Sequence, residues 1–222
     1  DTFSSRGLGD VYKRQIVCSL LFLLVSCHNN DSLFVLLPSN KTQIKFQNKL
    51  TSTTDLNILN YLYYYNGAGV AAADFNNDGF ADLYFTGNQT EDKLYLNLGG
   101  LEFKDITKQA LINNATPWTT GVTTVDINND GFLDIYICKI GLHNSIKGEN
   151  LLYVNQGPGK NGVPTFKEAA SFYGLDIASF ATQASFFDFD KDGDLDLFLI
   201  NHSLYPNSNY GKGAIRREVD QM

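Results

Sequence analysis

The stretch GVAAADFNNDGFADLYF, residues 69–85, decides the fold, because an apolar run leads into an acidic turn and then into a second apolar and aromatic run. Three aspartates and two asparagines fall within residues 74–82. Taken alone, this stretch fits an ordinary tight turn, an EF-hand-type calcium loop, or a metal site held between two strands. The rest of the chain has to distinguish these three interpretations.

The same pattern occurs three times along the chain. Residues 69–75 match residues 121–127 and, less closely, residues 183–189, and each copy leads into an acidic turn followed by a strand-like run. The turns begin at Asp74, Asp126 and Asp188, so the copies are 52 and then 62 residues apart. The additional length lies in glycine-rich connections, which indicates that insertions fall between strands.

The first copy divides into four short strand-like runs, at about 69–75, 82–87, 93–98 and 101–106, with Gly99-Gly100 in the last hairpin turn. Four antiparallel strands at a period of some fifty residues are typical of a β-propeller blade. A β-sandwich of hairpins would explain the short strands, but not the recurrence of the acidic turn. The sequence therefore predicts an all-β fold, a β-propeller fragment of about three four-stranded blades with the third incomplete.

Each acidic loop carries oxygen-bearing side chains at its first, third, fifth and ninth positions and glycine at its sixth. Calcium prefers six to eight oxygen ligands, and a backbone carbonyl at the seventh position would complete such a set. Glycine permits the sharp bend in the loop. The predicted calcium ligands are Asp74, Asn76, Asp78, Phe80 and Asp82 in loop 1, Asp126, Asn128, Asp130, Phe132 and Asp134 in loop 2, and Asp188, Asp190, Asp192, Asp194 and Asp196 in loop 3.

Two observations favour metal loops over EF-hands and plain turns. An EF-hand needs an acidic residue at position 12, where this chain has Phe85, Ile137 and Leu199, and its flanks are helical rather than strand-like. The loops also hold eleven aspartates in a chain whose formal net charge is -7. Clustered carboxylates repel one another by about 1 kcal/mol per pair even in water, which a plain turn has no reason to bear three times. We expect loop 3, the richest in carboxylates, to bind calcium most tightly.

These repeats resemble FG-GAP/VCBS repeats, the calcium-bearing blades of integrin-alpha-type propellers, from about residue 61 to the end of the chain. The arrangement also resembles bacterial lipoproteins of the cartilage-acidic-protein-like group, whose longer members end in an ASPIC/UnbV domain. The resemblance implies a propeller of about seven blades in the full-length protein, so we expect this chain to be a fragment. No ASPIC/UnbV region is present in these 222 residues.

The N-terminal part divides into segments of different character. Residues 1–15 resemble translated adaptor sequence and are expected to be non-native, and residues 16–27 resemble a lipoprotein signal peptide with a lipobox, in which Cys27 is the lipidation site. A short buried helix is the alternative for the apolar run. Residues 28–58 are expected to form a tether with room for one strand, and the repeats occupy residues 59–222.

The rest of the sequence contains few candidates for reactive or ligand-binding residues. Cys138 lies in a strand-like run and is expected to be a buried packing residue, and His202 is expected in a solvated loop, although it could line a site. Trp118 and the tyrosines of residues 61–65 suit either blade packing or a binding face. The acidic composition argues against nucleic acid as a partner.

We therefore expect an exported, non-enzymatic, calcium-binding lipoprotein of the cell envelope, anchored to the outer membrane through its lipid. Its propeller would bind a protein or a glycan, and the calcium would be structural. The alternative is a secreted polysaccharide-degrading enzyme whose catalytic residues lie outside this chain.

Overall fold

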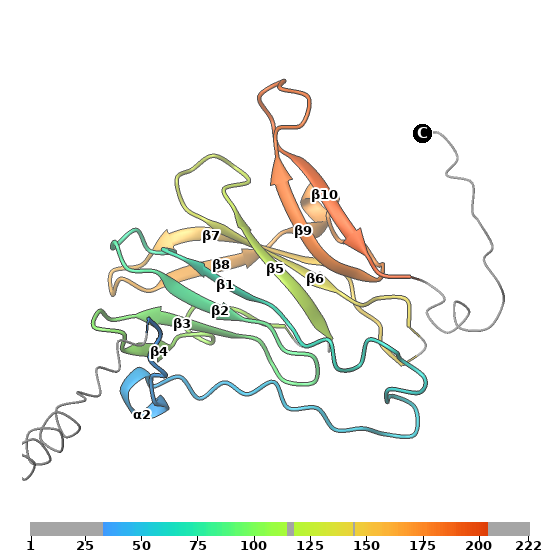
Figure 1. Ribbon diagram of the computed structural model, residues 1–222. Helices are drawn as coiled ribbons and strands as arrows, with labels where there is room; N and C mark the ends of the chain where they lie inside the picture. The colour runs from blue at the N-terminus through green and yellow to red at the C-terminus, as the bar shows by residue number, and fades with distance from the viewer. Residues whose placement is uncertain (1–32, 115–117, 144, 204–222) are drawn as a thin grey trace, which may run out of the picture. The chain divides into compact units, whose positions relative to one another are not determined.

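The computed structural model describes residues 33–114, 118–143 and 145–203, coloured in Figure 1. Residues up to Leu37 form a unit separate from the unit that begins at Pro38, and the fold below is that of the second unit. Among the described residues, no helix has the length and apolar character that crossing a membrane would require.

The second unit is built from antiparallel sheets that repeat along the chain, as predicted. The first two sheets have four strands each, and the third has two strands within the described residues. The first sheet contains β1 (Val70–Ala73), β2 (Asp82–Phe85), β3 (Lys93–Asn97) and β4 (Phe103–Asp105); the second contains β5 (Thr119–Val125), β6 (Asp134–Lys139), β7 (Leu151–Pro158) and β8 (Pro164–Glu168); the third contains β9 (Ala181–Phe187) and β10 (Asp196–Asn201).

Strand β6 shows why the sheets pack face to face as blades. All six of its residues are buried. Ile135 and Ile137 belong to an apolar core shared with the first sheet, whereas Tyr136 and Cys138 belong to a core shared with the third. A strand buried on both faces is expected to be apolar throughout rather than alternating. The central sheet is therefore enclosed between its two neighbours, and Cys138 is the buried packing residue that the sequence predicted.

The first and last hairpins of a blade form as the sequence indicates. In the first sheet, the β3–β4 turn is closed by hydrogen bonds from the Leu98 N–H to the Glu102 carbonyl oxygen and from the Glu102 N–H to the Gly99 carbonyl oxygen. Gly99 and Gly100 have φ of 88° and 60°, the left-handed region that glycine enters without steric cost.

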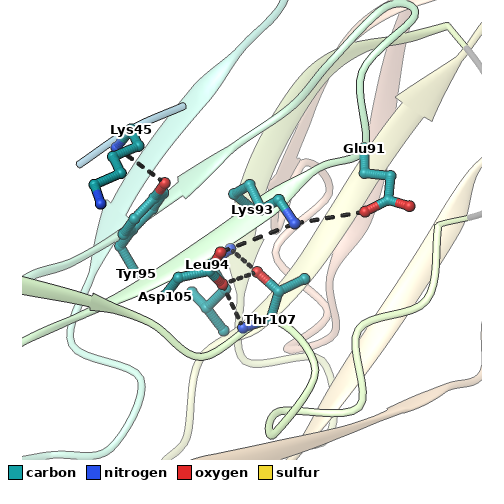
Figure 2. Close-up of polar contacts among 7 residues, drawn as sticks. All are labelled: Lys45, Glu91, Lys93, Leu94, Tyr95, Asp105 and Thr107. Atoms are coloured by element: carbon teal, nitrogen blue, oxygen red, sulfur yellow. Dashed lines mark hydrogen bonds and ion pairs between the residues drawn. The ribbon is translucent and has the colours of Figure 1, made fainter. Parts of the chain in front are cut away.

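Polar contacts extend the pairing of β3 and β4 beyond the ladder, as Figure 2 shows. The Thr107 hydroxyl accepts a hydrogen bond from the Leu94 N–H (3.0 Å) and donates one to the Asp105 carboxylate (2.6 Å). The Lys93 ammonium lies 3.8 Å from the same carboxylate, near its exposed ion pair with Glu91. Together these groups hold the outer two strands of the first blade in register.

The segment after residue 38 lies along the first blade. It begins with the short helix α2 (Ser39–Thr42), forms no strand in residues 43–58, and alternates between exposed and partly buried residues from 43 to 50. The Phe46 ring stacks on Phe85 at 5.1 Å between centroids, and the Lys45 N–H donates to the Tyr95 hydroxyl, as drawn in Figure 2. This flank of the first blade is covered by the chain itself.

The second short helix, α3 (Ala170–Tyr173), connects β8 to the third sheet. Figure 1 shows β5 lying between β1 and β9. These three strands are the first strands of the three sheets. Each of these first strands ends at an acidic loop, so the three loops share one end of the repeating structure.

Candidate metal centre

The three acidic loops connect the first and second strands of each sheet and share one backbone conformation. In each loop the fourth and sixth residues have positive φ, between 57° and 97°. Glycine and asparagine adopt this region more readily than other residues, which explains the Asn-x-Gly pattern in the first two loops. The fourth residues are Asn77, Asn129 and Lys191, and the sixth residues are Gly79, Gly131 and Gly193. Lysine at the fourth position of loop 3 is the exception.

The first aspartate of each loop organises the turn. In loop 1 the Asp74 carboxylate accepts hydrogen bonds from the N–H groups of Asp78 (3.0 Å) and Gly79 (2.7 Å). Asp126 makes the equivalent contacts in loop 2, and Asp188 accepts from the Gly193 N–H in loop 3 at 3.2 Å. A carboxylate that accepts backbone N–H groups curls the loop around itself.

The third and fifth residues lie side by side in the first two loops. The Asn76 amide donates to the Asp78 carboxylate at 2.8 Å, and Asn128 donates to Asp130 at the same distance. The other oxygen of each aspartate accepts the N–H of the seventh residue, Phe80 or Phe132, at 2.9 Å. These contacts hold the side chains of the third and fifth residues together in each of the two loops.

The ninth aspartate has a structural role that the sequence analysis missed. Asp82 is completely buried, and its two carboxylate oxygens accept the N–H of Phe75 (3.1 Å) and the N–H of Asn97 (2.8 Å). It therefore fastens the loop to the third strand of the blade. Burial raises the pKa of Asp82 to about 6, although these two hydrogen bonds act in the opposite direction.

The second blade repeats this arrangement closely. Asp134 is completely buried and accepts the N–H groups of Ile127 (2.9 Å) and Asn155 (2.7 Å), and burial raises its pKa to about 6. The available sequence signal was the asparagine at the equivalent position of the third strand in both units, Asn97 opposite Phe103 and Asn155 opposite Phe166. Each of these asparagines also accepts the N–H of a turn glycine two residues later.

Loop 3 differs because its ninth aspartate is only partly buried. The Asp196 carboxylate accepts the Phe189 N–H at 2.8 Å, and within the described residues no third strand supplies the second N–H. Carboxylate oxygens of Asp188, Asp190 and Asp196 all lie within 4.8 Å of one another. In the described part of the chain this is the group of acidic side chains whose spacing suits a shared metal ion. The two remaining predicted ligands, Asp192 and Asp194, are exposed neighbours in the same loop.

The first two loops also touch each other across the boundary between blades. The Asn77 amide donates to the Gly131 carbonyl oxygen of loop 2 at 3.1 Å, and the Asn76 amide donates to the Gly162 carbonyl oxygen at 3.1 Å. Loop 1 is thus supported by residues of the second blade as well as by its own.

A second polar cluster, which was not predicted from the sequence, lies buried between the first two blades. Asp92 accepts hydrogen bonds from the Tyr84 hydroxyl (3.0 Å) and the Asn114 amide (2.6 Å), and the Lys139 ammonium donates to the Asn114 amide oxygen. Burial lowers the pKa of Lys139 to about 8, and the nearby Asp92 carboxylate partly offsets this. Burial likewise raises the pKa of Asp92.

The other residues named in the sequence analysis are the aromatic residues of segment 61–65, Trp118, His202 and the cysteines. Tyr61, Tyr64 and Trp118 belong to an apolar cluster, which is the packing alternative. His202 is half-buried rather than solvated, because its ring stacks on Tyr63 at 4.1 Å and its Nε2 lies 3.1 Å from the Tyr61 hydroxyl. Cys27 lies outside the described residues. Burial raises the pKa of Cys138 to about 12, which suits an unreactive thiol.

Residues 74–137 match the family model of the FG-GAP-like repeat. The match begins at the first aspartate of loop 1 and extends into β6, so it contains both of the first two loops. FG-GAP-like repeats form β-propeller blades, and the four-stranded antiparallel sheets described above agree with this.

The chain is also similar to part of the cartilage acidic protein 1 of three vertebrates. The chain is 31% identical to human cartilage acidic protein 1 over 137 residues, and 30% identical to the mouse protein over 137 residues. It is 30% identical to the Xenopus tropicalis protein over 139 residues. These matches cover about 60% of the chain but only about a fifth of each relative. The similarity is therefore distant, and the chain corresponds to a small part of these longer proteins.

Proposed function

We propose that the chain is part of a calcium-binding β-propeller that acts as a binding module, with calcium in a structural role. The observation that carries this proposal is the convergence of Asp188, Asp190 and Asp196 within 4.8 Å, in a loop that recurs at the same place in three successive blades. FG-GAP-like repeats often bind calcium, and residues 74–137 match that family.

The donor set fits a hard cation. The side chains that face one another in the loops offer carboxylate and amide oxygens, which calcium prefers, and no sulfur or imidazole ligand stands among them. When bound, calcium would neutralise the repelling carboxylates and so favour the folded loop. Asp188, Asp190 and Asp196 would hold the ion in loop 3. Asp74, Asn76 and Asp78 in loop 1, and their counterparts in loop 2, would hold theirs.

We further propose that the protein is an exported lipoprotein of the cell envelope that binds a protein or glycan and is not itself an enzyme. The support is the lipobox-like sequence ending at Cys27 and the resemblance of the repeat sequence to lipoproteins of the cartilage-acidic-protein-like group. In the first two loops, the aspartate carboxylates accept backbone N–H groups, which suits a structural role better than acid–base catalysis.

Thermal unfolding with calcium, with magnesium and with chelator tests the metal. Binding to the folded state alone adds about 1.4 kcal/mol per site at tenfold excess over the dissociation constant. We expect calcium to raise the melting temperature, and Asp188→Ala to reduce that increase. Asp55→Ala, an exposed aspartate outside the loops, should keep the full increase. An unchanged melting temperature on addition of calcium would refute the proposal.

A further inference from the structure

A cavity of about 240 Å³ lies where all three blades and the segment before β1 meet. Its residues come from the N-terminal side of β1, from the beginning of β5, and from the beginning of β9. The acidic loops follow the other ends of these same strands. The cavity is therefore at the opposite end of the blades from the candidate metal sites, and its residues are not shared with them.

The wall of the cavity is aromatic. The Tyr61 and Trp118 rings meet edge to face at 5.4 Å, and the Tyr63 ring stacks on His202. Tyr61 and Trp118 are almost completely buried, whereas Tyr63 and His202 are partly exposed. A rigid aromatic wall with partly exposed rings offers the apolar face of a ligand a surface against which to stack.

Gln183, Asn66 and Tyr63 line the cavity and have hydrogen-bonding groups that are not used within the described residues. The Gln183 amide donates one hydrogen bond, to the Val122 carbonyl oxygen, which leaves its own oxygen and its second N–H available. The side chains of Asn66 and Tyr63 make no hydrogen bond within the described residues. Amide side chains that both donate and accept are suited to pairs of neighbouring hydroxyl groups.

The cavity is also neutral. Among the residues that the structure describes, no Asp, Glu, Lys or Arg lines it. His202 is the one titratable imidazole among the lining residues, and its pKa is lowered, chiefly by burial. Its Nδ1 lies 2.9 Å from the Ser203 carbonyl oxygen and therefore carries the proton, so that Nε2 accepts from the Tyr61 hydroxyl. A charged ligand would find no counter-charge here, and burying a charge without one is costly.

We propose that this cavity binds one neutral sugar ring of a glycan, stacked against Tyr63 and hydrogen-bonded by Asn66 and Gln183. The volume supports a single ring, because pockets for larger drug-sized molecules occupy about 300–1,000 Å³. The inference rests on the proposed function as a binding module and specifies its ligand class and its location.

Trp118 makes the proposal directly measurable. It is the single tryptophan of the chain and lies in the cavity wall, so tryptophan fluorescence reports on this site. The probes are the methyl glycosides of glucose, galactose and mannose, together with glucuronate and galacturonate. We expect a saturable change in fluorescence with at least one neutral glycoside and at least tenfold weaker binding of the corresponding uronate.

Matched variants separate the cavity from the rest of the surface. Tyr63→Ala and Asn66→Ala should each weaken sugar binding about tenfold. Tyr65→Ala removes a neighbouring, 65% exposed tyrosine that does not line the cavity and should bind as the original chain does. Far-ultraviolet circular dichroism and the calcium-dependent melting shift establish that each variant is folded.

The outcomes distinguish this inference from the function on which it rests. A chain that calcium stabilises, but whose tryptophan fluorescence responds to no neutral glycoside, would overturn the sugar site and leave the calcium proposal standing. Equal binding of neutral sugars and uronates, or unchanged binding in Tyr63→Ala, would also overturn it. Sugar binding without any calcium effect would instead refute the metal proposal alone.

Discussion

The Asn155 amide, in the third strand of the second blade, donates a 2.8 Å hydrogen bond to the carbonyl oxygen of Phe75 in loop 1. Asn97 occupies the same position in the first blade, but among the described residues its amide donates within that blade, to the Ala81 carbonyl oxygen. The repeated asparagine thus closes its own blade in both units and, in the second, also joins that blade to the one before it.

This difference provides a matched pair of variants. Asn97→Ala and Asn155→Ala each remove one amide that holds the turn of its own blade, but only Asn155→Ala also removes the bond between blades. We expect Asn155→Ala to lower the free energy of unfolding by about 1 kcal/mol more than Asn97→Ala, because the net contribution of one hydrogen bond to stability is of about that size. Urea denaturation of the two variants measures the difference. Equal losses would show that the inter-blade bond contributes nothing.

The composition of loop 3 allows the contribution of one carboxylate to be tested in both directions. Asp190→Asn gives loop 3 the asparagine that loops 1 and 2 carry at their third position, and Asn76→Asp does the reverse. We expect calcium affinity to fall several-fold in the first variant and to rise in the second, because ligand charge tunes calcium binding. Isothermal titration calorimetry resolves the change. A gain in affinity with Asp190→Asn would contradict the assignment of Asp190 as a ligand.

Two glycines, Gly121 within β5 and Gly69 just before β1, predict unequal effects on stability when each is replaced by alanine. A Cβ at Gly121 would overlap the carbonyl oxygen of Thr182 in the third sheet, whereas a Cβ at Gly69 would lie 3.1 Å from the Thr120 carbonyl oxygen. We expect Gly121→Ala to destabilise the chain by about 1–3 kcal/mol, since overpacking against backbone forces the blades apart. Gly69→Ala should cost less, and thermal melts of both variants show whether that order holds.

The buried Lys139 predicts an increase in stability with pH. Its pKa is about 8 in the folded chain and 10.5 when unperturbed, so between these values the unfolded chain binds more protons than the folded one. Stability should therefore rise with pH across that window, by roughly 1–3 kcal/mol, and level off above it.

Lys139→Met removes this contribution. Chemical denaturation of both chains at pH 7.5, 8.5 and 9.5 should show a flatter profile for Lys139→Met, whatever its absolute stability. Lys108→Met, at an exposed lysine, is the control and should follow the original profile. Parallel profiles for the chain and Lys139→Met would mean that Lys139 titrates at the same pH in both states.

Much of the fold could be predicted from the sequence, because the residues that determine it are close together in the chain and recur in each repeat. The strands, the Gly99-Gly100 turn and the acidic loops follow from residues that are neighbours in the chain. The buried cluster of Asp92 and Lys139 could not be predicted, because these two residues are 47 positions apart and belong to different blades. The position of His202 against Tyr61 was missed for the same reason, since the two are separated by 141 positions.

For the candidate site, the sequence identified the residue types of the loops but only part of their roles. It treated Asp82 as a ligand alone, whereas the structure gives both of its oxygens backbone partners, one of them on the third strand. That partnership depends on the pairing of strands that are distant in sequence. The identification of calcium as the bound ion and of each residue as a ligand remains a prediction.

The contact between Asn77 of loop 1 and the Gly131 carbonyl oxygen of loop 2 joins two candidate calcium sites through a single hydrogen bond. Asn77 and Gly131 are the fourth and sixth residues of their loops, at which the backbone takes its left-handed conformation. An ion that orders one loop would therefore fix an acceptor of the other, and lower the entropy that the second loop still has to lose. The calcium sites of neighbouring blades would therefore fill cooperatively, and their occupancy would change over a narrow range of calcium concentration.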